Sequence, residues 1–245
     1  MSSTSGLKGR LAGRVGAVVV AAGGSQRMSG VDKVFAPLLG KPLVAYSLDA
    51  LEACPLVDEI ALVLSAGNLE QGRGLVRDSG WRKVRHVCLG GARRQDSVGC
   101  GLAALSPDVR WVLIHDGARP CVTPDIVERG LEAALETGAA VAAIPVADTI
   151  KVVGPDGHVR QTPPRAELYA AQTPQVFLRD LLVRAYQASD ADATDGAAVV
   201  ERFGVRVCVF AGAPANLKVT TPDDLTLAEA LLRRRLVSAA GIGPC

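Results

Sequence analysis

The fold is decided by residues 15–33, which read Val-Gly-Ala-Val-Val-Val-Ala-Ala-Gly-Gly-Ser-Gln-Arg-Met-Ser-Gly-Val-Asp-Lys. The run from Val15 to Val20 is apolar and rich in β-branched residues, which predicts a strand buried on both faces. The strand breaks at residues 21–25, where the side chains are small, and the cations Arg27 and Lys33 follow. Small residues let a ligand approach main-chain N–H groups, and cations neutralise phosphate charge. The stretch is therefore a candidate nucleotide-binding turn.

Two common phosphate-binding motifs do not fit this turn. The dinucleotide fingerprint needs Gly-x-Gly-x-x-Gly, but Ser25 and Met28 stand at its second and third glycine positions. A P-loop needs Gly-Lys-Ser/Thr at its end, and the sequence contains no such triplet. From the turn alone, an ordinary strand-to-helix connection that uses glycine for backbone freedom remains an alternative.

Composition narrows the class of protein. Of the 245 residues, 49% are hydrophobic and 4% aromatic, so a sizeable core must consist mainly of Val, Leu, Ile and Ala. A net charge of +2, with no basic stripe interleaved with aromatics, argues against nucleic-acid binding. No apolar run reaches the roughly 18 residues that span a bilayer, which argues against a membrane protein. The six cysteines contain no Cys-x-x-Cys pair, which disfavours a zinc or redox site and favours a reducing cytoplasm.

The chain is expected to form one domain. Residues 1–13 are Ser/Gly-rich and basic without a long apolar run, which predicts a disordered lead-in rather than a signal peptide. Residues 14–236 alternate between strand and helix patterns, which is typical of an α/β protein with a Rossmann-like, doubly wound and mostly parallel sheet. Residues 237–245 are expected to be a loose tail. The expected strands are 15–20, 60–64, 84–89, 111–114, 139–146, 172–177 and 205–210, and the expected helices are 42–53, 69–79, 95–105, 123–136, 178–188, 195–203 and one opened by residues 221–224.

Residues 147–170 interrupt this alternation with a predicted β-hairpin arm. Residues 149–153 alternate in polarity, Gly154-Pro155-Asp156-Gly157 forms a turn, and residues 158–162 alternate again. A two-stranded hairpin is marginally stable by itself. The arm is therefore expected to pack on a second subunit, which predicts a homodimer.

Polar residues gather where the predicted strands end, the edge at which open α/β sheets bind ligands. They are Arg27 and Lys33 after the first strand, Gly90, Gly91, Arg93, Arg94, Asp96 and Ser97 after the third, His115, Asp116 and Arg119 after the fourth, Asp148, Thr149 and Lys151 after the fifth, and Lys218 and Thr220 in a late loop. Cations outnumber acids in this set. The balance suits a substrate with several phosphates better than hydride transfer or hydrolysis by paired carboxylates.

Eight blocks of residues carry a more specific signal. They are Ala21-Ala22-Gly23-x-x-x-Arg27-Met28, Lys33, Gly90-Gly91-x-x-Arg94-x-Asp96-Ser97, His115-Asp116-Gly117-Ala118-Arg119-Pro120, Asp148-Thr149, Gln172-Thr173-Pro174-Gln175, Thr194-Asp195 and Asn216-x-Lys218-x-Thr220-x-Pro222-x-Asp224-Leu225. In this order they resemble the 2-C-methyl-D-erythritol 4-phosphate cytidylyltransferase family of the non-mevalonate isoprenoid pathway. The resemblance spans roughly residues 15–235. No single block is decisive, but eight in register are highly specific.

The resemblance implies a reaction and its partners. CMP would pass from CTP to the phosphate of methylerythritol phosphate, with release of pyrophosphate and with Mg²⁺ on the triphosphate. The acceptor phosphate would attack the α-phosphorus in line, without a covalent enzyme intermediate, so that catalysis rests on positioning and charge stabilisation. In the family the arm crosses to the partner of a homodimer and completes its site.

The resemblance also implies a role for individual residues. The catalytic cations would be Arg27, Lys33 and Lys218. The nucleotide would be held by Ala21, Ala22, Gly23, Gly91, Arg94, Ser97 and Asp116, and Asp116 would also be the metal ligand. The acceptor phosphate would be held by Arg119, Thr149, Arg165 and Lys218.

Two positions depart from the family pattern. Ser25 stands where a second glycine is usual, and Ala92 stands where an acid is common. Ser25 adds bulk beside the phosphates, and Ala92 removes one cytosine contact, so that base selection would depend on the main chain and Ser97. Three other functions remain open: a cytidylyltransferase for ribitol 5-phosphate, a sugar-1-phosphate nucleotidyltransferase that uses UTP or GTP, and a non-catalytic nucleotide sensor.

Single residues also have simpler interpretations. Asp116 and Arg119 could form only a loop ion pair, and Asp195 could be only a helix cap. Arg94 is favoured over Arg93 as the ligand. His115 is expected to orient its loop rather than to move protons, because a phosphate nucleophile is already deprotonated.

Overall fold

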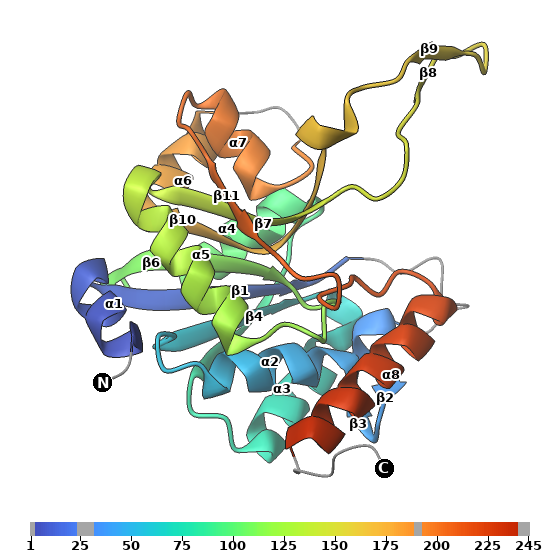
Figure 1. The fold of residues 1–245 in the computed structure, drawn as a ribbon. Helices are drawn as coiled ribbons and strands as arrows, with labels where there is room; N and C mark the ends of the chain where they lie inside the picture. The colour runs from blue at the N-terminus through green and yellow to red at the C-terminus, as the bar shows by residue number, and fades with distance from the viewer. Residues whose placement is uncertain (1–2, 24–31, 189–192, 240–245) are drawn as a thin grey trace.

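Seven strands form one mixed, mostly parallel sheet (Figure 1). The structure is a computed structural model that describes residues 3–23, 32–188 and 193–239. The strands, in spatial order, are β11 Cys208–Ala211, β7 Ala139–Pro145, β10 Tyr169–Leu178, β6 Val109–Asp116, β1 Arg14–Ala21, β4 Glu59–Leu64 and β5 Val84–Leu89. All neighbours are parallel except β10, which is antiparallel to both β6 and β7. The predicted α/β class and its mostly parallel sheet are confirmed.

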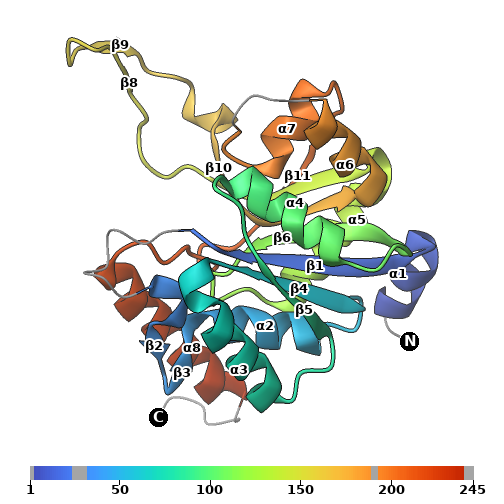
Figure 2. The ribbon, with the colours of Figure 1, turned by 180° about the vertical axis from the view of Figure 1, so that it is seen from behind.

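Helices cover both faces of the sheet (Figures 1 and 2). They are α1 Ser3–Leu11, α2 Leu43–Ala53, α3 Leu69–Ser79, α4 Arg94–Ala104, α5 Pro124–Thr137, α6 Arg179–Gln187, α7 Gly196–Arg202 and α8 Pro222–Ala239. Side chains of α1, α2, α3 and α5 pack with Ala17 and Val19 on one face, while α4, α6 and α7 pack with Val18 on the other. This alternation along β1 follows from the two-residue period of a strand and produces the double winding.

The last helix forms a separate apolar cluster beside the sheet. Ala228 and Leu232 of α8 pack on Leu38 and Leu43. Leu38 belongs to a small hairpin of β2 Pro37–Leu38 and β3 Lys41–Pro42, which the sequence interpretation missed. Because Pro42 lies in β3, α2 begins one residue later than predicted, at Leu43. The cluster fixes α8 close to the late loop that precedes it.

The two ends of the chain differ from the expectation. Residues 3–11 form α1, in which Leu7 and Leu11 are 4% and 1% exposed, so the prediction of a disordered lead-in over residues 1–13 is wrong for this part. Two leucines four residues apart lie on one helix face and bury there. At the other end α8 continues to Ala239, beyond the predicted start of the tail at residue 237, and residues 240–245 lie outside the described part.

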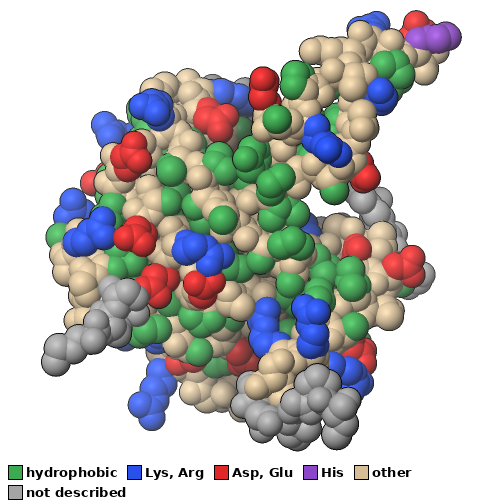
Figure 3. Space-filling view, viewed as in Figure 1, with side chains coloured by type: hydrophobic (Ala, Val, Ile, Leu, Met, Phe, Trp, Pro, Cys, Tyr) green, Lys and Arg blue, Asp and Glu red, His purple; other side chains and the backbone are tan. Residues whose placement is uncertain are grey.

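The inserted hairpin lies where the sequence predicts it. Strands β8 Val152–Val153 and β9 Val159–Gln161 pair in an arm that projects from the body between β7 and β10 (Figures 1 and 3). Its strands are shorter than expected, and their valines are exposed. The chain leaves the sheet at the end of β7, forms the arm, and re-enters the sheet at the same edge. The next strand, β10, must therefore run in the opposite direction, which explains why it is antiparallel to its neighbours. None of the described helices has the length and apolar character required to cross a membrane.

Candidate active site

Most of the predicted site residues meet at the carboxyl edge of the sheet. Here β1 ends at Ala21 and β6 ends at Asp116, and the turn after Asp116 packs against the end of β1. A Cβ added at Gly117 would lie 3.0 Å from the Cβ of Ala21, so any larger residue would force its neighbours apart by a few tenths of an ångström. The late loop is tied to the same turn, because the N–H of Val219 donates to the carbonyl of Ala118 at 2.8 Å. Three separate stretches of chain are therefore joined at one point.

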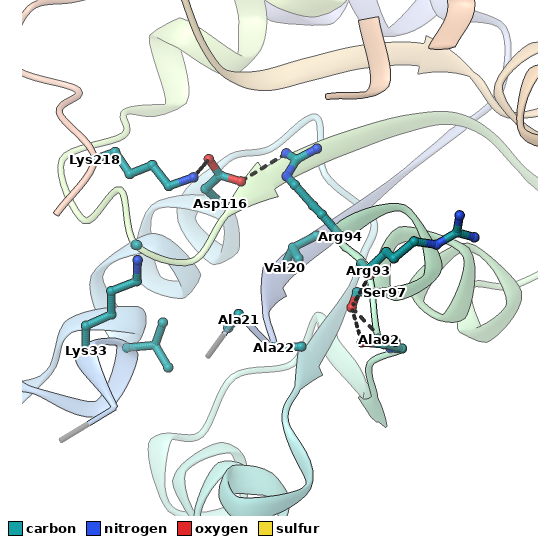
Figure 4. A pocket seen from close by; sticks show the side chains of 14 residues that line it. Val20, Ala21, Ala22, Lys33, Ala92, Arg93, Arg94, Ser97, Asp116 and Lys218 are labelled. Carbon is teal, nitrogen blue, oxygen red and sulfur yellow. Dashed lines mark hydrogen bonds and ion pairs between the residues drawn. The ribbon is translucent and has the colours of Figure 1, made fainter. Parts of the chain in front are cut away.

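Asp116 is the centre of the charged network. It is 7% exposed, and its carboxylate lies 2.9 Å from Nζ of Lys218, 3.0 Å from Nη2 of Arg94 and 3.6 Å from Nε of Arg119. Figure 4 shows Arg94 and Lys218 reaching Asp116 from opposite sides. Three cations thus share one carboxylate, and the excess positive charge favours an anionic ligand.

These neighbours keep Asp116 ionised. Burial by itself raises the pKa of the carboxyl group, but the opposing attraction of Arg94 and Lys218 is greater and holds the pKa well below its usual range. Burial lowers the pKa of Arg119, and the adjacent Asp116 partly offsets this shift. The carboxylate of Asp116 therefore stays ionised at neutral pH.

A first cavity of about 190 Å³ opens beside this network. It is lined by Val20, Ala21, Ala22, Gly23, Lys33, Val34, Gly91, Ala92, Arg93, Arg94, Ser97, Asp116, Ala118 and Lys218. The N–H of Gly91 donates to Oγ of Ser97 at 3.2 Å, so the hydroxyl orients the backbone at the end of β5 (Figure 4). One wall is small and apolar and the other is cationic, which suits a ligand with a flat base and several phosphates.

The two arginines at the start of α4 have different partners. Arg93 forms an ion pair with Asp96 at 2.7 Å, and its N–H donates to the same carboxylate in a capping box. Arg94 is the first residue of α4 and reaches Asp116 instead. Arg94 thus joins the Asp116 network, while Arg93 is paired with Asp96 at the start of its own helix.

A second cavity of about 160 Å³ lies on the other side of Asp116. It is lined by Arg94, Asp116, Arg119, Ala171, Gln172, Thr173, Gln175, Thr194, Asp195 and Lys218. Arg94, Asp116 and Lys218 line both cavities and therefore stand between them. Asp195 also caps α7, because its carboxylate accepts from the N–H of Ala198 at 2.9 Å.

Lys33 reaches the first cavity from a short 3₁₀ turn, Lys33–Phe35. Asp32 caps this turn by accepting the N–H of Val34 at 3.2 Å, and Asn68 donates to the other oxygen of Asp32. The capped turn holds the backbone of Lys33 in place while the long side chain extends toward the cavity (Figure 4).

Two predicted residues, Thr149 and Arg165, are not brought to this centre. A third, Arg27, lies outside the described residues, as does the departure at Ser25. Thr149 and Arg165 belong to the arm region, and neither is among the described residues that line the two cavities of their own chain. Arg165 donates to the carbonyl of Ala147 at 2.9 Å, within the base of the arm.

Some site residues received no role from the sequence. Gln172, Thr173 and Asn216 were noted only as parts of family blocks, yet each is at most 5% exposed. Gln172 and Thr173 line the second cavity, and Asn216 donates to the carbonyl of Thr173. Asn216 accepts from Nη1 of Arg119 through its main-chain carbonyl at 2.8 Å. The available signal was the presence of polar residues in a segment that otherwise follows a buried strand pattern.

The acidic groups limit how a metal could bind. Within the described ranges, no group of three or more His, Cys, Asp or Glu side chains is arranged to hold an ion. Asp116 is the only acid lining the first cavity in that part of the chain. A single carboxylate fits Mg²⁺ held chiefly by phosphate oxygens and water.

The fold and site define an α/β protein with a cation-lined cavity, suited to phosphorylated ligands, at the carboxyl edge of its sheet. Residues 15–234 match the family described as IspD: 2-C-methyl-D-erythritol 4-phosphate cytidylyltransferase. The enzyme of that name from Dehalococcoides mccartyi strain CBDB1 is 51% identical over 221 residues, which cover 90% of this chain and 97% of the relative. The one from Symbiobacterium thermophilum is 49% identical over 222 residues, which cover 89% and 92%.

Solved structures agree with this assignment. A 4-diphosphocytidyl-2C-methyl-D-erythritol synthase from Anaerococcus prevotii superposes with a TM-score of 0.82 at 29% identity, covering 94% of this chain and 99% of that one. The 2-C-methyl-D-erythritol 4-phosphate cytidylyltransferase from Thermus thermophilus gives 0.71 at 34% identity, covering 90% and 99%. The chain belongs to the 2-C-methyl-D-erythritol 4-phosphate cytidylyltransferase family. It is a nucleotidyltransferase whose reaction joins CTP and methylerythritol phosphate and releases pyrophosphate.

Proposed function

We propose that the acceptor phosphate attacks the α-phosphorus of CTP in line, with the two substrates in the two cavities. The observation that carries this proposal is the bridge of Arg94, Asp116 and Lys218, which borders both cavities. The bridge offers two cations where the phosphates of the two substrates would meet. Negative charge builds on the α-phosphoryl oxygens during the reaction, and preorganised cations stabilise that charge.

The first cavity is the proposed nucleotide site. Main-chain groups at Ala21, Ala22 and Gly91 would contact cytosine together with Ser97, and the ribose would lie near Gly23 and Asp116. Arg27, Lys33 and Lys218 would then brace the triphosphate, with Arg94 beside them. The small side chains at the end of β1 support this arrangement, because they leave the backbone open to a ligand.

The second cavity is the proposed acceptor site. Arg119 and Lys218 would hold the phosphate of methylerythritol phosphate from within the chain. Thr149 and Arg165 would complete the site from the arm of a second copy. In the part of the chain that the structure describes, neither residue lines its own cavities, which is consistent with a role in the neighbouring subunit.

The arm supports a homodimer with arm exchange. Val152, Val153 and Val159 are 43%, 54% and 58% exposed on the arm. Hydrophobic side chains also gather on the body near the base of the arm (Figure 3), where Tyr169 and Val209 are each 54% exposed beside an apolar groove. Apolar surfaces on both parts of one chain can cover each other across a two-fold axis.

We also propose that a divalent cation binds beside the nucleotide. Asp116 would contribute to binding a divalent cation such as Mg²⁺, which when bound neutralises part of the triphosphate charge. Because Asp116 already contacts Arg94 and Lys218, these side chains would turn to the phosphates when the nucleotide binds.

The proposed location of the protein is the cytoplasm. The five cysteines in the described ranges are free thiols, which is consistent with a reducing cytoplasm.

The experiment that tests the proposed function is pyrophosphate release from CTP, Mg²⁺ and methylerythritol phosphate in a coupled assay. Release that depends on all three components is expected. Release with ribitol 5-phosphate alone would instead assign the second candidate acceptor, and release only from UTP or GTP with a sugar 1-phosphate would assign another nucleotidyltransferase. Binding of CTP without any release would indicate a nucleotide sensor.

A further inference from the structure

We propose that His115 is a positioning residue of the active site, whose imidazole, hydrogen-bonded through both ring nitrogens, fixes the turn that carries Asp116 and Arg119. The inference rests on the proposed roles of those two residues. His115 lies near the end of β6 and is 0% exposed, and it is not among the described residues that line either cavity. It therefore acts through its neighbours rather than on a substrate.

Both ring nitrogens of His115 have partners. Nε2 lies 3.3 Å from the main-chain oxygen of Arg119, and Nδ1 lies 3.0 Å from Oγ1 of Thr173. The same Oγ1 accepts the N–H of Asp116 at 3.0 Å. Because a carbonyl oxygen only accepts, Nε2 carries the ring proton, and Nδ1 is left to accept the hydroxyl of Thr173. Each of these three hydrogen bonds then has one donor hydrogen and one acceptor.

Asn216 closes these hydrogen bonds into a cyclic network. Its Nδ2 donates to the carbonyl of Thr173 at 2.7 Å, and its own main-chain carbonyl accepts from Nη1 of Arg119 at 2.8 Å. The network joins β6, β10 and the loop before α8, all at a buried position. Since Lys218 follows Asn216 by two residues, one hydrogen-bonded unit locates Asp116, Arg119 and Lys218 together.

The hydrogen bonds of His115 give its ring a structural role. Nε2 needs a proton to donate to the carbonyl of Arg119, and Nδ1 needs a lone pair to accept the Thr173 hydroxyl. With both nitrogens engaged in this way, the imidazole is a rigid hydrogen-bonded spacer and not a proton carrier.

Substitution of His115 tests the positioning role. His115→Phe keeps a ring and removes both nitrogens, and kcat is expected to fall about tenfold to a hundredfold. KM for the acceptor should rise more than KM for CTP, because Arg119 lines only the second cavity. His115→Gln restores an N–H donor toward Arg119 and should recover part of the loss. Unchanged turnover in folded His115→Phe, or no recovery in His115→Gln, would overturn the proposal.

A second measurement needs no variant at position 115. Long-range ¹H–¹⁵N correlation spectra of the wild-type chain at about pH 7.5 report which ring nitrogen is protonated. The chain has three histidines, so His86→Gln and His158→Gln assign the remaining ring. A neutral ring protonated on Nε2 is expected, and a proton on Nδ1 or on both nitrogens would contradict the inference. The spectra require no substrate, so their outcome is independent of whether CMP transfer is observed.

Discussion

Two buried carboxylates lie at opposite ends of the sheet and are held in different ways. Glu59, at the amino end of β4, is 0% exposed and accepts from the N–H and the hydroxyl of Ser106 at 2.6 and 2.7 Å, with Arg14 at 3.2 Å. Asp116, at the carboxyl end of β6, is surrounded by cationic side chains instead. Those of Lys218 and Arg94 are 39% and 25% exposed and line the cavities.

The difference separates a structural carboxylate from the one that we propose to be functional. A main-chain donor such as the N–H of Ser106 is fixed by the fold, so the bond that it gives to Glu59 holds the strand permanently. A flexible cationic side chain such as Lys218 can exchange one anion for another. The two carboxylates are similarly buried, so their donors, and not the acid itself, point to the Asp116 end as the proposed ligand site.

The largest expected effect is on turnover at the Asp116 end. Lys218→Ala should lower kcat by about 10²–10³, because it removes a preorganised cation from the proposed transition state. Pyrophosphate release under saturating CTP measures this loss. Lys8→Ala, which removes an exposed ion pair with Asp58, is the control and should keep wild-type turnover. A loss of kcat below about tenfold in Lys218→Ala would contradict the proposed role of the Asp116 end in catalysis.

The second effect is on stability at the Glu59 end. Glu59→Ala should lower the free energy of unfolding by about 3 kcal/mol, because it leaves the part-buried N–H and hydroxyl of Ser106 without their acceptor and removes the buried carboxylate on Arg14. Urea denaturation measures this change. Asp108→Ala removes the other carboxylate on Arg14, at 61% exposure, and should cost less than about 1 kcal/mol. Equal losses in the two variants would show that burial does not distinguish them.

The third effect tests whether the Asp116 end is completed by another chain. Arg165→Ala and Lys33→Ala should each be inactive alone, whereas mixed dimers contain one site with an intact Lys33 and an intact arm. With random exchange, about one quarter of the wild-type activity should return. The control is a mixture without subunit exchange. No recovery after exchange, monitored with a tagged subunit, would place each site within a single chain.

The smallest effect concerns a third carboxylate, Asp224, which is held by main-chain donors as Glu59 is, but is only half-buried. Its side chain accepts from the N–H groups of Thr220 and Thr221, each at 2.8 Å, and from the Thr220 hydroxyl at 2.7 Å. The hydroxyl bond is the largest cause that lowers the pKa of Asp224, to about 2.

Because the pKa is depressed in the folded state, the contribution of Asp224 to stability is complete above the unfolded pKa of about 4 and is lost as the pH falls toward 2. Asp224→Asn should therefore reduce the decline of the unfolding free energy across this window. Denaturant titrations at several pH values measure the slope, and Asp223→Asn, one residue earlier in the same turn, is the control. If the unfolding free energy of Asp224→Asn falls with pH as steeply as that of the wild type, Asp224 is not the source of this pH dependence.

Sequence reasoning succeeded where the information is local. The β-branched run before the small residues predicted β1, and the polarity alternation around residues 154–157 predicted the arm. It failed at α1, because the Ser/Gly-rich composition concealed two leucines that pack on the body. It also gave no role to Thr173 and Asn216, since a polar residue in a buried segment acquires meaning only through its partners.

The sequence by itself determined the order of strands and helices and the loops that carry the cations. Apolar periodicity and turn residues act over a few positions, and these are readable from the chain alone. Only the tertiary structure decided that Asp116 lies between Arg94 and Lys218, with a cavity on each side. Those contacts join residues far apart in the chain, and the packing of whole elements on both faces of the sheet brings them together.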